Sequence, residues 1–486
     1  MTALDEEKRI ITVGFSGEVD YAPKEHLVQC GDVPTATLRK AVIRFALSLL
    51  AGAKAYKPLL DYLNRRHPDI RGVKPGTDLL AGKPTTTDNI WDVVSRMNDT
   101  TLYIQGPPGA GKTYTGAHLI ARLVKAGKKV AICSNSHKAV NHLMIAAHEL
   151  LCEARHKHLA FKKFSDDDHK CDRPGISDVK DDGKIVSAIA HLSLAGGVVW
   201  TFCKEDLDQE FDYLFVDEAG QVSLANLIAM GVCARNIVLL GDQMQLGQPI
   251  QAAHPGRSGE SALDYLLDGK ATIEPSRGIF LDKTFRMHPE VCSFISDCFY
   301  EGRLKPEART AGQRLVLSGT PHPALKPTGI VLHEVPHQDN SQRSKEEAAE
   351  AKSLIESLLK QRYIDHAGKE HPMTLNDILV VAPYNAQVSL LKKTLPKGSR
   401  VGTVDKFQGQ EAQAVIVSMS SSNADDSPRG MGFLLDRNRL NVAVSRAKCL
   451  SIIVCSPHLL ESTAKTVEDI TRLNVLGRAK MATLFQ

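Results

Sequence analysis

Short, almost wholly apolar runs recur along this chain and alternate with segments of helical periodicity. A first series consists of TLYIQ from Thr101, VAIC from Val130, YLFV from Tyr213 and NIVLL from Asn236. A second series consists of GIVLHEV from Gly329, ILVVAP from Ile378, VGTV from Val401, AVIVSM from Ala414 and LSIIVC from Leu450. Strands that are apolar on both faces are typical of parallel sheets covered by helices on either side. The sequence therefore predicts an α/β fold with two tandem, doubly wound parallel sheets.

The chain of 486 residues is too long for one ordinary domain. We expect an accessory or stalk segment at 1–82, a first α/β domain at 83–275 and a second at 276–486. The charged, weakly periodic stretch at about 150–190 is expected to be an insertion on the surface of the first domain. In the second domain, Ser344 and Glu347 have capping-box spacing at the start of a predicted helix.

Composition excludes several classes of protein. Lys and Arg number 60 against 56 Asp and Glu, so a net charge of +4 does not by itself indicate a polyanionic partner. The ten cysteines are scattered, several inside apolar runs, which favours buried free thiols over a disulfide framework. The N-terminal MTALDEEKRI has acids and no apolar core, and AVIRFALSLLAGA is interrupted by Arg44. These features predict a cytoplasmic protein without membrane association.

The strongest motif is GPPGAGKT, from Gly106 to Thr113, between a predicted strand and a predicted helix. In this context, the backbone N–H groups of a glycine-rich loop and a helix N-terminus can wrap a polyphosphate. We expect Lys112 to neutralise the β- and γ-phosphate oxygens and Thr113 to hold Mg²⁺ through its hydroxyl. The loop alone indicates nucleoside triphosphate binding and no more.

Two further motifs predict what acts on the triphosphate. In LFVDEAGQ, Asp217 ends a buried strand, where a ligand of the magnesium ion and its waters is needed, and Glu218 can orient and deprotonate the attacking water. In GDQMQLGQP, Gln245 is the candidate sensor of the γ-phosphate, because an amide both donates and accepts hydrogen bonds. Read alone, the acidic pair would be an ordinary helix cap and the glutamine a polar turn.

The series of motifs resembles superfamily-one helicases with two RecA-like domains, and among them the Up-frameshift and senataxin branch. The resemblance covers Thr86 to Pro457 and rests on GPPGAGKT, SNSHKAVNHL, LFVDEAGQ, LLGDQMQLGQP, TFRMHP, FYEGRL, VVAPYNAQ, VGTVDKFQGQE and RLNVAVSRAK. The variant SNSHKAVNHL is similar to bacterial proteins in which such a helicase follows a RecB-like nuclease. The N-terminal segment is too short for that nuclease, so nuclease activity is not predicted.

The resemblance implies roles that spacing alone does not show. Arg286 and Arg446 match arginines that reach the γ-phosphate from the second domain, and Glu411 matches a residue near the ribose. Phe285 stands where the family has an adenine-stacking tyrosine and keeps the aromatic face. The glutamine that reads the adenine edge is not evident, and Asn89 is offered in its place. The full expected nucleotide set is Asn89, Gly106, Pro107, Pro108, Gly109, Ala110, Gly111, Lys112, Thr113, Tyr114, Phe285 and Glu411.

The resemblance also implies a path for a nucleic-acid strand across both domains. The residues expected to contact it are Ser134, Asn135, Ser136, His137, Thr201, Tyr384, Asn385, Thr403 and Lys406. Small hydroxyl and amide groups suit contacts to phosphate and sugar, so low sequence specificity follows. Taken alone, each of these residues is also compatible with an ordinary polar residue of a surface loop.

The resulting hypothesis is an ATP- and Mg²⁺-dependent helicase or translocase on single-stranded nucleic acid, with DNA favoured over RNA. The 5′-to-3′ direction is implied by the branch alone. The alternative is a nucleic-acid-stimulated ATPase that clamps or remodels complexes, for example for a nuclease partner, without separating strands. A plain P-loop GTPase or transporter subunit is disfavoured, because NKxD and LSGGQ motifs are absent from the sequence.

A group of potential metal ligands lies within the expected insertion: Cys152, His156, His158, His169 and Cys171. Their Cys-x₃-His and His-x-Cys spacings could hold Zn²⁺ but match no standard finger. The favoured interpretation is that this group binds no metal and that the neighbouring basic residues face nucleic acid.

Overall fold

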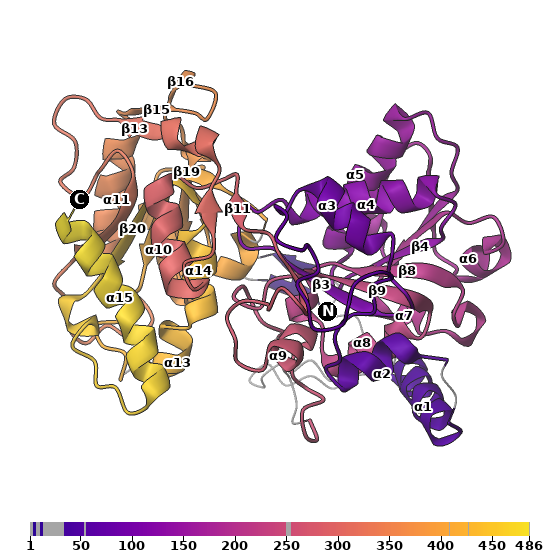
Figure 1. Cartoon of the computed structure of the whole chain (residues 1–486). Coiled ribbons are helices and arrows are strands. Elements are labelled where there is room, and N and C mark those ends of the chain that lie inside the picture. Colours follow the sequence, from indigo (N-terminus) through magenta and orange to yellow (C-terminus); the bar gives the residue numbers. More distant parts are fainter. Residues whose placement is uncertain are drawn as a thin grey trace. The chain divides into compact units, whose positions relative to one another are not determined.

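The computed structural model describes residues 3–5, 10–12, 34–52, 55–248, 254–407, 409–425 and 427–485. The chain divides into two units, Met1–Ala36 and Thr37–Gln486. In the first unit, β1 (Ala3–Asp5) and β2 (Ile10–Thr12) pair antiparallel. The second unit contains two large parallel sheets, which we call the first and the second lobe with the helices that cover them (Figure 1).

The first lobe is built on eight parallel strands in the order β10-β3-β9-β8-β4-β7-β5-β6. Their bounds are β10 (Gly278–Phe280), β3 (Thr101–Gln105), β9 (Ala234–Gly241), β8 (Phe211–Val216), β4 (Val130–Cys133), β7 (Leu194–Gly197), β5 (Ala160–Lys163) and β6 (Ile176–Val179). Successive residues of a strand point to opposite faces, so Ile104 packs in one hydrophobic cluster and Tyr103 in another. Both faces are therefore buried, as the unbroken apolar runs predicted.

Helices cover both faces of this sheet (Figure 1). One cluster includes α3 (Thr87–Val94), α4 (Lys112–Lys125) and α5 (His137–Glu153), and the other includes α1 (Ala36–Leu50), α2 (Lys57–Leu63), α7 (Val199–Phe202) and α8 (Leu224–Gly231). The sequence predicted an accessory or stalk segment at 1–82. From Thr37 onward, the structure instead shows the helices of this segment packed on the sheet of the first lobe. The hydroxyl of Tyr56 donates to Asp208, and Leu59 packs against Gly231, because α2 is apolar on the face that meets the sheet.

The stretch at about 150–190 was predicted to be a surface insertion, but in the structure it is part of the sheet. It supplies β5 and β6, which extend the parallel sheet at one edge. Each strand has only four residues, and half of them are polar (AFKK and ISDV), so the segment lacks the apolar run that marks the central strands. The strand β10, just past the expected boundary at 275, also belongs to the first sheet.

The second lobe contains five parallel strands in the order β14-β20-β19-β17-β18. Their bounds are β14 (Gly329–Glu334), β20 (Ala447–Cys455), β19 (Ala412–Ser418), β17 (Ile378–Val381) and β18 (Arg400–Gly402). One cluster joins this sheet to α11 (Lys345–Leu358) and α12 (Asn385–Thr394). The opposite face packs against α10 (Pro289–Phe299), α14 (Arg437–Val444) and α15 (Val467–Phe485). The two doubly wound parallel sheets predicted from the sequence are confirmed.

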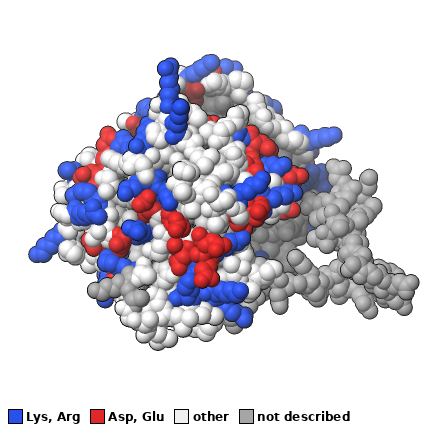
Figure 2. Space-filling view, turned by 90° about the vertical axis from the view of Figure 1, so that its right-hand side faces the viewer, with Lys and Arg blue, Asp and Glu red and all other residues white. Residues whose placement is uncertain are grey.

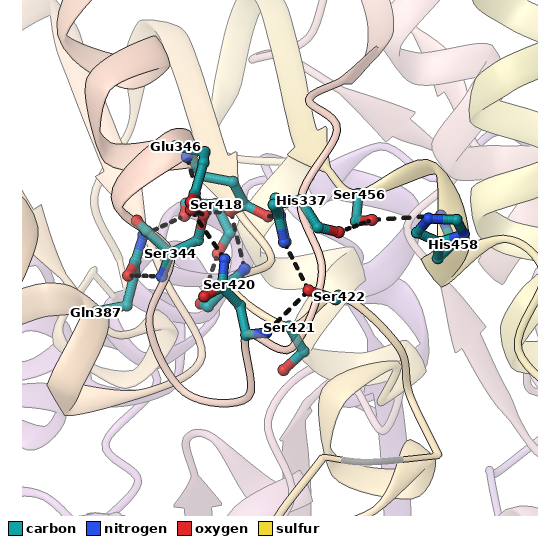
Figure 3. Close-up of polar contacts among 12 residues, drawn as sticks. His337, Ser344, Glu346, Gln387, Ser418, Ser420, Ser421, Ser422, Ser456 and His458 are labelled. Atoms are coloured by element: carbon teal, nitrogen blue, oxygen red, sulfur yellow. Dashed lines mark hydrogen bonds and ion pairs between the residues drawn. The ribbon is translucent and has the colours of Figure 1, made fainter.

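A buried polar network holds α11 to its sheet (Figure 3). The Ser344 hydroxyl caps α11 by accepting the Glu347 N–H at 3.0 Å, as the spacing predicted. The fully buried Glu347 carboxylate does not complete a capping box. It accepts instead from the Ser418 hydroxyl at 2.6 Å and lies 3.0 Å from the ring of His337. A buried carboxylate needs such partners, so the network fixes α11 against the carboxyl end of β19.

No helix among the described residues combines the length and apolarity that a membrane crossing requires.

Candidate active site

The loop Gly106–Gly111 connects β3 to α4, at the carboxyl edge of the first sheet. Gly109 and Gly111 have φ of 72° and 80°, a region that favours glycine. A Cβ on Gly109 would also lie 2.6 Å from the Thr284 hydroxyl oxygen and from Arg286 Cβ. The glycines are thus required both by the turn and by the close approach of the chain segment that carries Arg286.

This loop lines a pocket of about 510 Å³. The first lobe contributes Pro107, Pro108, Gly109, Ala110, Gly111, Lys112, Thr113, Tyr114, Ser134, Ser136, Lys138, Ala139, His142, Asp217, Glu218, Gln221 and Gln245. Strand β11 (Lys283–Thr284) leads to Arg286, and the second lobe adds Asp405, Lys406, Gly409 and Arg446. All six residues that sequence reasoning proposed as catalytic (Lys112, Asp217, Glu218, Gln245, Arg286 and Arg446) therefore line one pocket.

The acidic pair lies where β8 ends. Asp217 is buried, and burial together with the charge of Glu218 raises its pKa to about 7, while the nearby Lys112 works in the opposite direction. Glu218 adopts a left-handed backbone conformation with φ of 52°, and its N–H donates to Asp217 Oδ1 at 3.0 Å. A left-handed residue other than glycine is uncommon and typical of functional turns. The tight turn brings both carboxylates to the pocket.

Gln245 belongs to a polar chain that reaches the second lobe. Its amide donates to Asp242 Oδ2 at 2.8 Å, and the Tyr300 hydroxyl donates to the same oxygen at 2.6 Å. Asn441 of α14 in turn donates to the Tyr300 oxygen at 2.8 Å and to the carbonyl of Met244 at 2.6 Å. All of these side chains are buried, and burial raises the pKa of Asp242.

Asp242, Tyr300 and Asn441 were missed as functional candidates. Asp242 follows an apolar strand in the sequence, as Asp217 does, and that signal could have been used. Nothing in the sequence shows that Tyr300 and Asn441 approach it.

The two arginines have different surroundings. Arg286 donates to Glu411 Oε2 at 2.8 Å and to the Ser445 carbonyl at 3.2 Å. Arg446 is only 3% exposed and donates to the Gln410 carbonyl at 3.4 Å, while its Nε and Nη2 have no hydrogen-bond partner among the described residues. Burial and the charge of Arg286 lower the pKa of Arg446 to about 9. A buried guanidinium with free donors is a preformed anion site.

The residues expected around the base and ribose are more dispersed. Phe285 is 53% exposed, and its backbone N–H donates to the Gly109 carbonyl at 2.9 Å, so its backbone lies beside the phosphate loop. Tyr114 is 62% exposed and stacks on His118. Asn89 donates to Pro84, and Glu411 pairs with Arg286 and Lys448. The structure does not gather Asn89, Phe285 and Glu411 in the pocket lining.

The residues expected to contact nucleic acid fall into three groups. Ser134, Ser136 and Lys406 line the phosphate pocket, and the hydroxyl of Ser134 is buried without a partner among the described residues. Asn135, His137 and Thr201 line a second pocket of about 430 Å³. Of the rest, the Tyr384 hydroxyl pairs with Ser427, Asn385 is exposed at the start of α12, and Thr403 follows β18 half-buried.

His137 is held in place from two sides. Its Nδ1 is 2.9 Å from Nζ of the buried Lys162, and its ring stacks on His169 at 4.3 Å. Burial and the charge of Lys162 lower the pKa of His137 to about 4.

One face of the molecule shows Lys and Arg intermingled with Asp and Glu (Figure 2), so that face offers no continuous basic surface.

Comparison with known proteins shows what the chain is similar to. Two consecutive family models, each described as an AAA domain, match residues 91–259 and 259–458. The chain is 28% identical to "DNA polymerase alpha-associated DNA helicase A" of Schizosaccharomyces pombe, over 71% of this chain and 59% of that protein. It is 28% identical to "Regulator of nonsense transcripts 1 homolog" of Drosophila melanogaster, over 74% of this chain and 33% of that protein.

A further relative is "DNA-binding protein SMUBP-2" of Rattus norvegicus, 27% identical over 75% of this chain and 42% of that protein. The chain thus spans between about a third and three fifths of the length of these relatives. The solved Arterivirus nonstructural protein 10 (helicase) is a distant likeness, with 17% identity over 73% of this chain and 59% of that one and a TM-score of 0.39. By its relatives and its two AAA-domain matches, the chain is similar to the Up-frameshift and senataxin-like branch of the superfamily-one helicases.

Proposed function

We propose that this chain is an ATP-dependent helicase or translocase that hydrolyses ATP in the pocket lined by both lobes. The observation that carries the proposal is the presence of Lys112, Glu218 and Arg446 in one pocket, although they come from different lobes. A triphosphate that touches all three would tie the lobes together, and its hydrolysis would release them. That cycle converts chemical energy into domain motion.

The side chains of the pocket suit a magnesium–triphosphate complex. Mg²⁺ prefers oxygen ligands, and the Thr113 hydroxyl and the Asp217 carboxylate are the donors beside the phosphate loop that would hold it. When bound, the ion would neutralise charge on the β- and γ-phosphates. Lys112, whose ammonium donates to the Gly106 carbonyl at 2.7 Å, lies against the loop where the same oxygens would sit.

Glu218 is the group that would orient the attacking water and accept its proton. Arg446 would supply the transition-state contact, because its two unpartnered donors are buried in the same pocket. Gln245 would report the state of the γ-phosphate, and its chain through Asp242 and Tyr300 to Asn441 offers a route to the second lobe.

Single-stranded nucleic acid is the proposed track, with DNA favoured and RNA as the other candidate. The names of the relatives include a DNA helicase and regulators of nonsense transcripts. The 5′-to-3′ direction, a nuclease partner and a cytoplasmic location remain predictions from the sequence. Ser134 and Ser136 line the phosphate pocket, and Asn135 and His137, which alternate with them in the sequence, line the second pocket, so a strand bound there would adjoin the triphosphate.

The test measures strand displacement on a 5′-tailed duplex together with ATPase activity stimulated by matched DNA and RNA oligonucleotides. We expect Glu218→Gln to lower turnover by about 10²–10⁴-fold while triphosphate binding persists. Glu205→Gln, an exposed acid of the first lobe, is the matched control and should leave both activities intact. Equal unwinding by Glu218→Gln would refute the assignment. Stimulated ATPase without displacement would favour the clamp over the helicase.

A further inference from the structure

Three potential metal ligands meet at the far end of α5. His148 and Cys152 are four residues apart on this helix, and His158 lies in the loop that leads to β5. Their ligand atoms all lie within 4.8 Å of one another. His148 Nδ1 is 2.8 Å from His158 Nε2. Cys152 Sγ is 4.0 Å from His148 Nδ1 and 3.4 Å from His148 Nε2.

This group differs from the one considered in the sequence. His148 was not part of it, whereas His169 and Cys171 lie elsewhere: His169 stacks on His137, and the N–H of Cys171 donates to Asp178. The helical spacing of His148 and Cys152 becomes informative only when the loop folds back to bring His158 to them.

Hydrogen bonds fix which ring nitrogens carry protons. His148 Nε2 lies 2.9 Å from the Pro174 carbonyl oxygen, and His158 Nδ1 lies 2.9 Å from the His156 carbonyl oxygen. A carbonyl oxygen only accepts hydrogen bonds, so each of these nitrogens must carry the hydrogen. In neutral rings, Nδ1 of His148 and Nε2 of His158 are then both unprotonated. Two lone pairs face each other across 2.8 Å.

Facing lone pairs require a cation between them, which is either an extra proton or a metal ion. A proton would leave a net positive charge beside a buried ring, and no carboxylate in the described part of the chain forms an ion pair with either histidine within 4.0 Å. A metal ion could take the Cys152 thiolate as well, which would offset charge. Ring N–H groups held by backbone carbonyls are also the usual surroundings of metal-bound histidine.

A second histidine cluster shows what a complete hydrogen-bonded arrangement looks like. His322 Nε2 and His333 Nε2 lie 2.8 and 2.6 Å from the same oxygen of Glu350. His322 Nδ1 accepts the Ala324 N–H at 3.2 Å, so its Nε2 carries the proton and donates to the carboxylate. No lone pairs oppose each other there, and the cluster needs no ion.

We propose that His148, Cys152 and His158 bind a zinc-like divalent ion. Two nitrogens and one sulfur are a typical ligand set for Zn²⁺. Two nitrogens on one tetrahedral zinc, each about 2.0–2.1 Å from it, would be roughly 3.3 Å apart, so the rings need separate by only about half an ångström. His156, in the same loop, has a buried Nδ1 without a partner among the described residues and is the candidate fourth donor.

The ion would have a structural role in the first lobe. It would tie the end of α5 to the loop before β5, and the His148–Pro174 bond would extend the tie toward β6. α5 begins at His137, directly after Ser134–Ser136, so the ion would brace the helix that carries the proposed nucleic-acid residues. ATP hydrolysis itself would not require it, because none of the three ligands lines the phosphate pocket.

The test is metal content and cobalt absorption of the full chain, without nucleotide. After equilibration with Zn²⁺ and dialysis, we expect one tightly held ion per chain, and substitution by Co²⁺ should give tetrahedral d–d bands with a thiolate charge-transfer band. The double variant His148→Gln, His158→Gln should lose the ion. Cys152→Ser changes only an exposed side chain and should lose the charge-transfer band while the fold persists. Chelation of the wild type should lower its melting temperature.

The matched control is the double variant His322→Gln, His333→Gln, which alters the second cluster and should keep the full metal content. An ion that remains with its thiolate band in Cys152→Ser would overturn the proposal. So would a wild-type chain that retains no zinc and shows instead a shared proton between the two rings by nitrogen NMR.

Discussion

The two lobes contribute to the phosphate pocket in different ways. On the first lobe, three of the proposed catalytic residues have partners on the same lobe: Lys112 donates to Gly106, Glu218 donates its N–H to Asp217, and Gln245 donates to Asp242. On the side of the second lobe, Arg286 is paired with Glu411, but Arg446 is buried with two free donors.

This difference indicates where a triphosphate would have its largest effect. The first lobe presents a preformed cradle whose conformation needs little from the ligand. The lowered pKa of Arg446 shows that burial and Arg286 disfavour its charge, so an anion placed between the two arginines would relieve both the repulsion and the missing hydrogen bonds. Binding energy would therefore be gained chiefly where the second lobe meets the phosphate.

The largest expected effect comes from Arg446→Met. Loss of a γ-phosphate arginine should lower ATPase turnover by about 10³–10⁵-fold. Most substitutions of buried residues lower stability, but this one should not do so in the absence of nucleotide. It removes the unsatisfied donors of Arg446, and an unsatisfied buried polar group costs about 1–3 kcal/mol. Steady-state ATPase assays and urea unfolding of the nucleotide-free protein measure the two quantities. A large loss of stability would show that Arg446 is already satisfied in the free protein.

Arg286→Met should separate the two arginines. Turnover should also fall, toward the lower end of that range at about 10³-fold, because the same transition-state charge loses one donor. Unlike Arg446→Met, Arg286→Met breaks an existing ion pair and should lower the free energy of unfolding. The loss should be only about 0.2–1 kcal/mol, because Glu411 is partly exposed and remains paired with Lys448. Equal unfolding curves for the two variants would remove the distinction between paired and unpaired arginine.

Tyr300→Phe tests whether the cradle is connected to the second lobe. The change removes the hydroxyl that joins Asp242 to Asn441 and should cost about 0.5–1.5 kcal/mol in stability. We expect ATP binding to persist and strand displacement per ATP to fall. Tyr103→Phe removes a similarly buried hydroxyl whose partners, the Gln243 side-chain oxygen at 3.0 Å and the Gly241 carbonyl at 3.5 Å, both lie within the first lobe. Identical losses of displacement in both variants would argue against a specific link through Tyr300.

The sequence predicted the central strands and the phosphate cradle because these depend on local patterns. Apolar runs mark strands buried on both faces, and Gly106–Thr113 and Asp217 lie next to such runs, at the edge where parallel strands end. Short edge strands left no such pattern: β5 and β6 have four residues each, half of them polar, so the segment was interpreted as an insertion.

Contacts between distant residues could not be predicted in the same way. Tyr300 is 58 residues from Asp242 and Asn441 is 141 residues from Tyr300, so their hydrogen bonds depend on how the two sheets pack. The pairing of Glu411 with Arg286 and Lys448, and the facing lone pairs of His148 and His158, likewise appear only in three dimensions.

The smallest expected effect belongs to Glu411→Gln, which changes an acid paired with Arg286. The resemblance implies a place near the ribose, whereas the structure shows the carboxylate paired with Arg286 and Lys448. If the main effect of the Glu411 carboxylate is to hold Arg286 and Lys448, Glu411→Gln should free both cations for the nucleotide. The variant should then bind ATP and 2′-deoxy-ATP more tightly by the same amount, about 0.2–1 kcal/mol or a few-fold. Titration calorimetry measures both, with the exposed Glu370→Gln as the control. A selective loss of ATP affinity would assign Glu411 to the ribose hydroxyl instead, and Arg286 would then reach the phosphate without first leaving a partner.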